Sequence, residues 1–179
     1  MQENKVAAHF RADLARWRQL VTPAWLAALT AGVPVAAAPA AGWRLFEVGC
    51  GGEALFERAH LPGASYVDSG EFESGPLWNK VDDAVLSRLL QSHGVRHDST
   101  VILYGRNNLA AARLAHLLLY AGVTDVRLPD GGFALWRTGG HPCAGGPCRR
   151  APQRAATGFG AAFPAHPAYL IDTGQARAL

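Results

Sequence analysis

The segment from Val101 to Arg113 has the pattern of an anion-binding loop but lacks a nucleophile. An apolar strand comes first, and a short polar turn and an Ala/Leu-rich helix follow it. In an α/β domain this order directs several backbone N–H groups and the positive end of a helix toward one small concave site. Such a site binds anions and lowers the pKa of a thiol at its base. The first residue after the strand is Gly105, which has no side chain to react. The segment therefore predicts a site that holds negative charge without covalent chemistry.

Two arginines are candidate contacts for an anion in this loop. The predicted loop consists of Gly105, Arg106, Asn107, Asn108, Leu109 and Ala110. Arg106 would assist the backbone N–H groups, and Arg113 on the following helix is a further candidate contact. The alternative for Arg113 is an ion pair with a buried carboxylate such as Asp68 or Glu47.

Cys50 is the one thiol whose expected position suits a replacement nucleophile. It follows a predicted strand, 44–48, and the carboxyl ends of parallel strands lie at the same edge of a sheet. Cys50 could therefore lie near Gly105, although a neutral loop cysteine is the simpler interpretation.

The other two cysteines, Cys143 and Cys148, lie in a Pro/Gly-rich stretch with His141. Their spacing matches no common zinc module, so no metal site is expected. A disulfide between them would require an oxidising compartment, and free thiols are the simpler interpretation. The sequence also contains no phosphate-binding glycine motif and no recognisable Ser-His-Asp grouping, so no cofactor is expected.

The elements that must position the loop alternate between strands and helices. Thr22 and Pro23 have the pattern of an N-cap and first helical residue, opening a short helix through about Leu29. Strands are then predicted at 44–48, 65–68, 101–104 and 125–128, and helices at 53–59, 81–93, 108–120 and 133–138. This alternation predicts an α/β domain with a mostly parallel, five-stranded sheet, of which these ranges place four strands, and helices on both faces.

Three ordered motifs resemble those of the rhodanese family. Residues 59–64, Ala-His-Leu-Pro-Gly-Ala, resemble the signature near the start of a rhodanese domain, and residues 128–136 resemble the Asp-Gly-Gly-x-x-x-Trp signature near its end. Between them lies the strand–loop–helix in which active rhodaneses carry their cysteine. Segments 73–81 and 94–106 are similar to the middle domain of the three-domain bacterial thiosulfate sulfurtransferases. In that subgroup the middle domain also lacks the loop cysteine, and the resemblance runs from about residue 14 to 179.

The resemblance implies a particular chemistry and a place within it. In an active rhodanese the cysteine thiolate attacks the outer sulfur of thiosulfate, sulfite leaves, and the resulting persulfide passes its sulfur to a thiophilic acceptor. In the three-domain enzymes that cysteine belongs to the domain that follows. The resemblance therefore implies a non-catalytic rhodanese-like domain of a tandem thiosulfate sulfurtransferase, which transfers no sulfur alone. Its partners would be the following catalytic domain and a small anion such as thiosulfate.

An alternative from another class is a Cys-less module that binds a protein or an anion. Unusual exposed aromatic side chains together with a gene that stops soon after Leu179 would favour this alternative. The resemblance implies a structural role for His60, and Trp78 and Trp136 are interpreted as packing and lid residues.

Composition excludes several other functions. The net charge is +3 with a pI near 9.0, and no basic run alternates with aromatic residues, so nucleic-acid binding is not expected. No stretch approaches the apolar length of a membrane-spanning helix, so no membrane partner is expected. The first residues do not resemble a secretory leader. The cytoplasm is the default compartment, and the periplasm is the alternative if a leader precedes this chain.

Four segments are predicted along the chain. Residues 1–21 form an amphipathic linker helix, 22–140 the rhodanese-like domain without the loop cysteine, 141–166 an inter-domain linker, and 167–179 the truncated start of a further rhodanese-like domain. The last prediction rests on an internal repeat, because the strand pattern of 42–48 recurs at 167–173. Within that repeat, Leu170 and Ile171 are expected to be exposed, disordered or packed on the first domain.

Overall fold

The computed structural model describes residues 19–147 and 157–179. A five-stranded sheet forms its centre, with strand order β1-β7-β6-β2-β3 and every neighbouring pair parallel. The strands are β1 (Leu20–Val21), β2 (Arg44–Gly49), β3 (Ser65–Asp68), β6 (Thr100–Tyr104) and β7 (Asp125–Pro129). The predicted α/β architecture with a five-stranded parallel sheet is confirmed.

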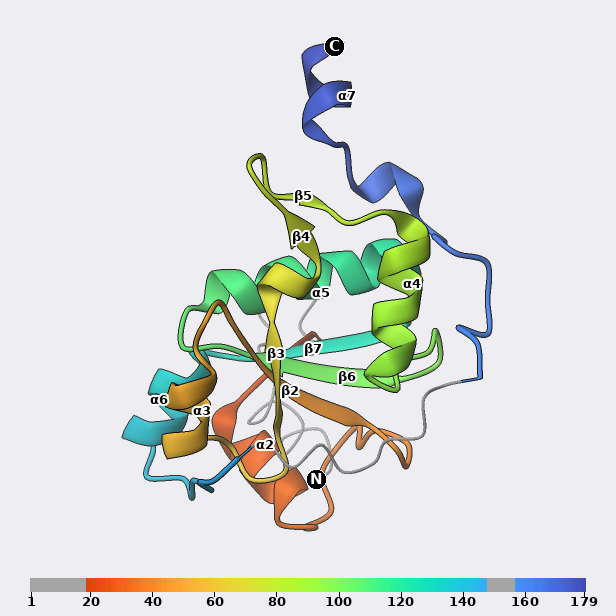
Figure 1. Cartoon of the computed structure of the whole chain (residues 1–179). Helices are drawn as coiled ribbons and strands as arrows, with labels where there is room; N and C mark the ends of the chain where they lie inside the picture. Colours follow the sequence, from red (N-terminus) through yellow and green to blue (C-terminus); the bar gives the residue numbers. More distant parts are fainter. Residues whose placement is uncertain (1–18, 148–156) are drawn as a thin grey trace.

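Helices cover both faces of this sheet (Figure 1). On one face lie α4 (Asp83–Ser92) and α5 (Asn108–Ala121), and on the other lie α2 (Pro23–Thr30), α3 (Glu53–Arg58) and α6 (Gly132–Thr138). The position of strand β6 between two core clusters explains its apolar sequence. Val101 and Leu103 pack in one cluster, and Ile102 packs in the other. A strand buried on both faces needs apolar side chains at every position rather than at alternate ones.

The first strand differs from the sequence prediction. Leu20 and Val21 were expected to end the N-terminal helix, but they pair in parallel with Leu128 and Pro129 at the edge of β7. Val21 is fully buried, and its carbonyl accepts a hydrogen bond from the Asp130 N–H at 2.8 Å. The exposed edge of β7 offers backbone partners that the sequence near residue 20 does not reveal. The rest of the predicted helix, 1–18, lies outside the described residues.

The helix predicted after Thr22 is confirmed. The Thr22 hydroxyl accepts a hydrogen bond from the Trp25 N–H at 3.2 Å, and Pro23 is the first residue of α2. Because the N-cap follows β1 directly, it turns the chain sharply from the sheet edge onto its face. None of the helices in the described ranges is long and apolar enough to cross a membrane.

A small hairpin projects from the α4/α5 face of the domain. Its strands, β4 (Glu73–Ser74) and β5 (Asn79–Lys80), are antiparallel and follow a 3-10 turn at Ser69–Glu71. The sequence patterns did not predict these strands, because each contains only two residues.

Both described parts of the predicted linker pack against the domain. Ala144 exchanges two backbone hydrogen bonds with His60, each 2.9 Å long. Phe159 is 5% exposed within the larger core cluster, and its carbonyl accepts a hydrogen bond from the His97 N–H at 3.1 Å. The flanks of segment 141–166 therefore contribute to the fold of the preceding domain.

The repeat after the linker does not form the expected strand. Pro167–Tyr169 is a 3-10 turn, and α7 (Thr173–Arg177) follows it. Leu170 packs partly against the core, whereas Ile171 is 57% exposed. A strand needs a neighbour to satisfy its backbone groups, and this segment pairs with none of the described strands.

Candidate functional site at the carboxyl edge of the sheet

Gly105 leaves β6 at the carboxyl edge of the sheet, and α5 begins three residues later. Asn107 caps this helix, since its Oδ1 accepts a hydrogen bond from the Leu109 N–H at 3.0 Å. The cap oxygen takes one of the N–H groups that an anion in the loop would otherwise use. The Asn107 side chain therefore satisfies part of the hydrogen-bonding capacity at the start of α5.

The backbone at Gly105 has no room for a side chain. A Cβ atom there would lie 2.5 Å from the Asn107 carbonyl oxygen and 3.1 Å from the Val48 carbonyl oxygen. Both obstacles are backbone atoms, which cannot move aside as a flexible side chain can. Any side chain at this position, a cysteine included, therefore requires the loop to be rebuilt.

The start of α6 closes the loop from the other side. The Gly105 carbonyl accepts a hydrogen bond from the Phe133 N–H at 3.1 Å. A Cβ on Gly132 would lie 2.2 Å from Asn108 Oδ1 and 2.6 Å from the Gly105 carbonyl oxygen. Glycine at position 132 therefore allows α6 to approach the loop closely.

Arg106 is occupied by the protein rather than directed toward an anion. Its Nε lies 2.7 Å from Oε1 of Glu47, a residue of β2 that is only 2% exposed. Its Nη2 donates to the Leu55 carbonyl at 2.9 Å and also to the Ala59 carbonyl. Because Glu47 neutralises its charge, Arg106 serves mainly to join β2, α3 and the loop.

The buried charge of Glu47 also affects Tyr104, the last residue of β6. Burial, together with the nearby Glu47 carboxylate, raises the pKa of Tyr104 well above its ordinary value. The Tyr104 hydroxyl accepts a hydrogen bond from the Leu61 N–H at 3.1 Å. Tyr104 therefore stays neutral and holds the turn after α3 in place.

Arg113 makes an ion pair, but with a different carboxylate from the two that the sequence suggested. Its Nε lies 2.6 Å from Oε1 of Glu73 in β4. Glu47, one of the expected partners, is taken by Arg106, and the other, Asp68, accepts hydrogen bonds from Gly51 and Gly70 N–H groups. Arg113 therefore fixes the hairpin on α5 rather than facing the loop.

Cys50 lies exposed in the turn between β2 and α3. In this turn the Gly51 N–H donates to Oδ2 of Asp68 at 2.7 Å, and the Gly52 N–H donates to the Tyr66 hydroxyl at 2.8 Å. Burial and the nearby Asp68 carboxylate raise the pKa of Tyr66 to about 12. The charged group in this turn is a carboxylate, whereas a reactive cysteine needs a cation or free N–H groups.

The remaining candidates divide into buried and exposed residues. His60 is buried and stacked on Phe56 with ring centroids 3.9 Å apart, and Trp136 is buried with its Nε1 donating to the Pro142 carbonyl. Both have the structural environment expected of them. Trp78, interpreted as a packing or lid residue, is 59% exposed. Cys143 is exposed, and Cys148 lies outside the described residues.

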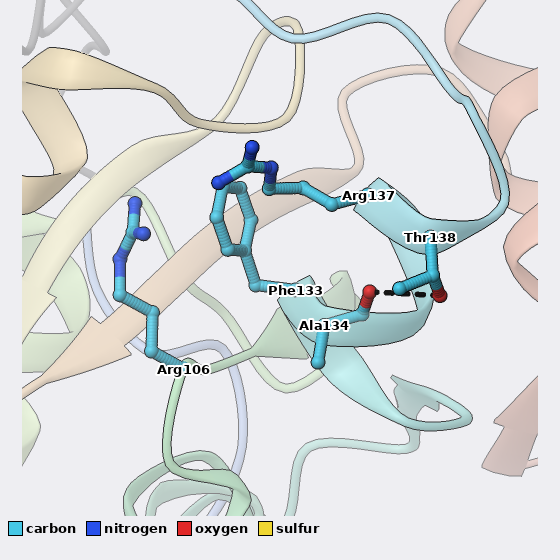
Figure 2. Close-up of a pocket in the computed structure, with 5 residues that line it drawn as sticks. All are labelled: Arg106, Phe133, Ala134, Arg137 and Thr138. Carbon is cyan, nitrogen blue, oxygen red and sulfur yellow. Dashed lines mark hydrogen bonds between the residues drawn. The ribbon is translucent and has the colours of Figure 1, made fainter.

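A shallow hollow of about 460 Å³ lies beside the loop, and the sequence analysis did not identify it. It is lined by Arg106, Phe133, Ala134, Arg137 and Thr138. Figure 2 shows the side chains of Arg106 and Arg137 extending along the same side of the hollow as the Phe133 ring, and the Arg106 Cζ lies 4.0 Å from the ring centroid. Arg137, at the end of α6, is the exposed cation of this hollow. Arg137 and Arg106 belong to distant parts of the sequence, so only the folded structure places them in the lining of one hollow.

Comparison with known proteins agrees with the fold and the motifs. The model of the Rhodanese-like domain family matches residues 39–138, which contain the sheet from β2 to β7 and the loop at Gly105. The chain belongs to the rhodanese family.

Over most of its length the chain is similar to a thiosulfate sulfurtransferase. It is 48% identical over 166 residues to thiosulfate sulfurtransferase YnjE of Escherichia coli, which covers 93% of this chain but 38% of that protein. The crystal structure of YnjE matches with a TM-score of 0.85. The sulfur carrier protein TtuD of Thermus thermophilus is 33% identical over 90 residues, covering 49% of this chain and 32% of that one.

Another solved structure resembles the chain over nearly the same extent. The wild-type structure of EanB matches with a TM-score of 0.82 at 26% identity, covering 92% of this chain and 41% of that chain. This rhodanese chain thus spans less than half the length of each of these relatives.

Proposed function

We propose that this chain is the non-catalytic rhodanese-like unit of a tandem thiosulfate sulfurtransferase. The sulfur would be carried by a loop cysteine in a further rhodanese-like unit of the same protein. The present unit would then have an architectural role, offering a surface to the catalytic unit and shaping the cleft between them.

The closed backbone at Gly105 is the observation that carries this proposal. A rhodanese needs a thiolate at the base of its loop, and this loop holds neither a sulfur atom nor the space for one. The fold and sheet edge are nevertheless those of the family. A unit with the family fold and a closed loop fits a structural role better than a catalytic one.

The similarity to YnjE supports the tandem part of the proposal. YnjE is named as a thiosulfate sulfurtransferase, and the matched region is 38% of its length. The strand pattern repeated at 167–173 supports it independently, since it resembles the opening of another such unit.

Mass spectrometry of the intact chain tests the catalytic half of the proposal. Residues 1–179 are incubated with thiosulfate, and the protein mass is compared before and after. We expect no gain of a sulfur atom. A gain of one sulfur atom that disappears in Cys50→Ser would show that Cys50 forms a persulfide, and the proposal would be wrong.

Reading the gene past the codon for Leu179 tests the tandem half. A continuation that encodes a strand, a loop cysteine and a helix supports the proposal. An in-frame stop would favour the alternative, a Cys-less module whose role is binding.

Anion binding in the hollow is a second candidate function, favoured by the exposed guanidinium of Arg137 in its lining. Guanidinium groups bind oxyanions through paired N–H donors. Calorimetric titration of the chain with thiosulfate should give a saturable heat, and Arg137→Gln should remove it. Heats equal to dilution in the unmodified chain would eliminate this candidate and leave the architectural role unaffected.

A further inference from the structure

The tip of the β4–β5 hairpin presents apolar side chains to solvent. Leu77 is 51% exposed and Trp78 is 59% exposed. Trp78 has a φ of 51°, a left-handed conformation that non-glycine residues seldom adopt. A tryptophan held in this conformation at an exposed tip gains no compensating burial within the described residues.

The base of the hairpin is firmly attached to the domain. Glu73 pairs with Arg113 of α5 at 2.6 Å, and Lys80 pairs with Asp83 of α4 at 2.6 Å. The Val81 N–H donates to the Phe72 carbonyl at 3.0 Å, which closes the base. These contacts hold the tip in a defined place, so docking would require little ordering of the hairpin.

The hairpin also contacts the segment that resembles the opening of another unit. Oδ1 of Asn79 accepts hydrogen bonds from the Thr173 N–H at 3.2 Å and from the Thr173 hydroxyl at 2.9 Å. The same segment also contacts α5, because Nε2 of His116 lies 2.7 Å from the Tyr169 carbonyl oxygen. Figure 1 shows the hairpin and α7 rising from the same side of the domain.

Further apolar side chains lie close to this junction. Tyr169 is 50% exposed and Ile171 is 57% exposed, four and two residues before Thr173. Together with Leu77 and Trp78, they place exposed apolar groups on both segments that meet at Asn79, the hairpin and residues 167–173. A monomeric domain seldom leaves such a grouping without a partner.

From these contacts we infer that the hairpin tip, Leu77 and Trp78, is a docking surface for the further rhodanese-like unit of the same protein. The inference rests on the proposed tandem organisation and identifies the surface that it would use. A unit whose first strand pattern begins at residue 167 starts against the hairpin, because Thr173 is hydrogen-bonded to Asn79. Tryptophan is enriched at the energetic centre of interfaces, and an apolar pocket on the second unit would accept it.

Hydroxyl-radical footprinting compares Trp78 in residues 1–179 with Trp78 in the full-length gene product. In residues 1–179 we expect rapid oxidation of the exposed ring, and in the full-length protein we expect at least a several-fold slower rate. Leu135, which is 48% exposed on α6, is the internal control and should be oxidised equally in both.

A substitution gives a second measurement. Trp78→Ser should not lower the melting temperature of residues 1–179, but it should lower that of the full-length protein. Leu135→Ser is the matched control, and it should change the melting temperature of both forms by the same amount.

The outcomes separate the docking surface from the tandem proposal. If the full-length protein transfers sulfur from thiosulfate while Trp78 is oxidised at the same rate in both forms, the docking inference is wrong and the tandem proposal stands. A gene that stops soon after Leu179 would overturn both. Concentration-dependent protection of Trp78 in residues 1–179 would assign the tip to a second copy of this chain and overturn the inference.

Discussion

Gly105 and Asn107 together decide what the carboxyl edge of the sheet can do. Gly105 lacks the sulfur, and the Asn107 carbonyl lies where the first side-chain carbon of a cysteine would be. Asn107 also caps the helix with its own side chain. Position 105 therefore excludes a reactive side chain through backbone shape as well as through residue type.

Gly105→Cys should therefore fail to give a working sulfurtransferase. Backbone overlap in a packed site costs about 1–3 kcal/mol, and relieving it displaces the loop. We expect a lower free energy of unfolding in urea and no persulfide after thiosulfate treatment. Gly105→Ala should lose similar stability, which separates the steric effect from that of the thiol. A stable, persulfide-forming Gly105→Cys would show that the loop opens readily.

The Arg106–Glu47 pair should contribute to stability rather than to ligand binding. Glu47→Ala leaves Arg106 without its carboxylate beside the core, and breaking such a pair costs about 3–5 kcal/mol when both charges are buried. Arg106 is partly exposed, so we expect about 2 kcal/mol by urea unfolding. Glu47→Gln keeps an acceptor and should lose less. Equal stability of Glu47→Ala and the unmodified chain would contradict this assignment.

At the scale of elements, adjacent strands are joined by side chains as well as by backbone. Thr100 of β6 pairs in register with Asp125 of β7, and its hydroxyl donates to Oδ2 of Asp125 at 2.8 Å. Arg127 donates to both carboxylate oxygens, and its Nη1 donates to the Ala37 carbonyl at 2.8 Å. This network ties β6, β7 and the loop before β2 at the amino edge of the sheet.

The stability of this network should depend on pH. Burial acts to raise the pKa of Asp125, but hydrogen bonds from Arg127 and Thr100 outweigh it and hold the pKa below its ordinary value. A lowered pKa means that the stabilisation is complete above the unfolded-state value and is lost as the pH falls through the folded-state value.

Asp125→Asn should therefore be less stable than the unmodified chain by about 1 kcal/mol at pH 7, a figure reduced for the partial exposure of Asp125. The difference should shrink as the pH falls below about 4, the ordinary range of the group. Urea unfolding of both proteins at several pH values measures it. A difference that stays constant down to pH 2.5 would contradict the role of the ionised carboxylate, where pH 2.5 is roughly the lower limit for such titrations.

At the scale of the whole molecule, segments outside the matched family region complete the core. The matched family region ends at residue 138, but Phe159 and Phe163 pack on the α5 side of the sheet with ring centroids 4.9 Å apart. The Ala165 N–H then donates to the Ala121 carbonyl at 3.2 Å, where α5 ends. The segment before the expected second unit thus belongs structurally to the first.

Phe159→Ala should destabilise the domain although it lies outside the matched family region. Removing a buried phenylalanine costs about 3–5 kcal/mol in a core, and the edge position of Phe159 places the expected loss near the lower value. Differential scanning calorimetry measures it, with Phe159→Leu as a control that should lose less. An unchanged melting temperature in Phe159→Ala would mean that segment 157–166 does not support the domain.

Local patterns in the sequence were sufficient for most of the sheet and for the identity of the loop. The apolar run of β6, the helix after it and the glycine between them depend on neighbours in the chain, whose periodicity is readable without the fold. The three ordered motifs indicated the rhodanese family, and the glycine at position 105 was evident from the residue itself.

Only the tertiary structure decided which groups meet. Arg106 and Glu47 are 59 residues apart in the chain, and Arg113 and Glu73 are 40 residues apart, so no local pattern assigns these partners. The sheet edge that pairs with Leu20 and Val21 and the core that receives Phe159 are likewise assembled from distant segments. The closure of the loop at Gly105 depends on carbonyl positions set by that packing, because steric room is a property of the folded backbone and not of the residue.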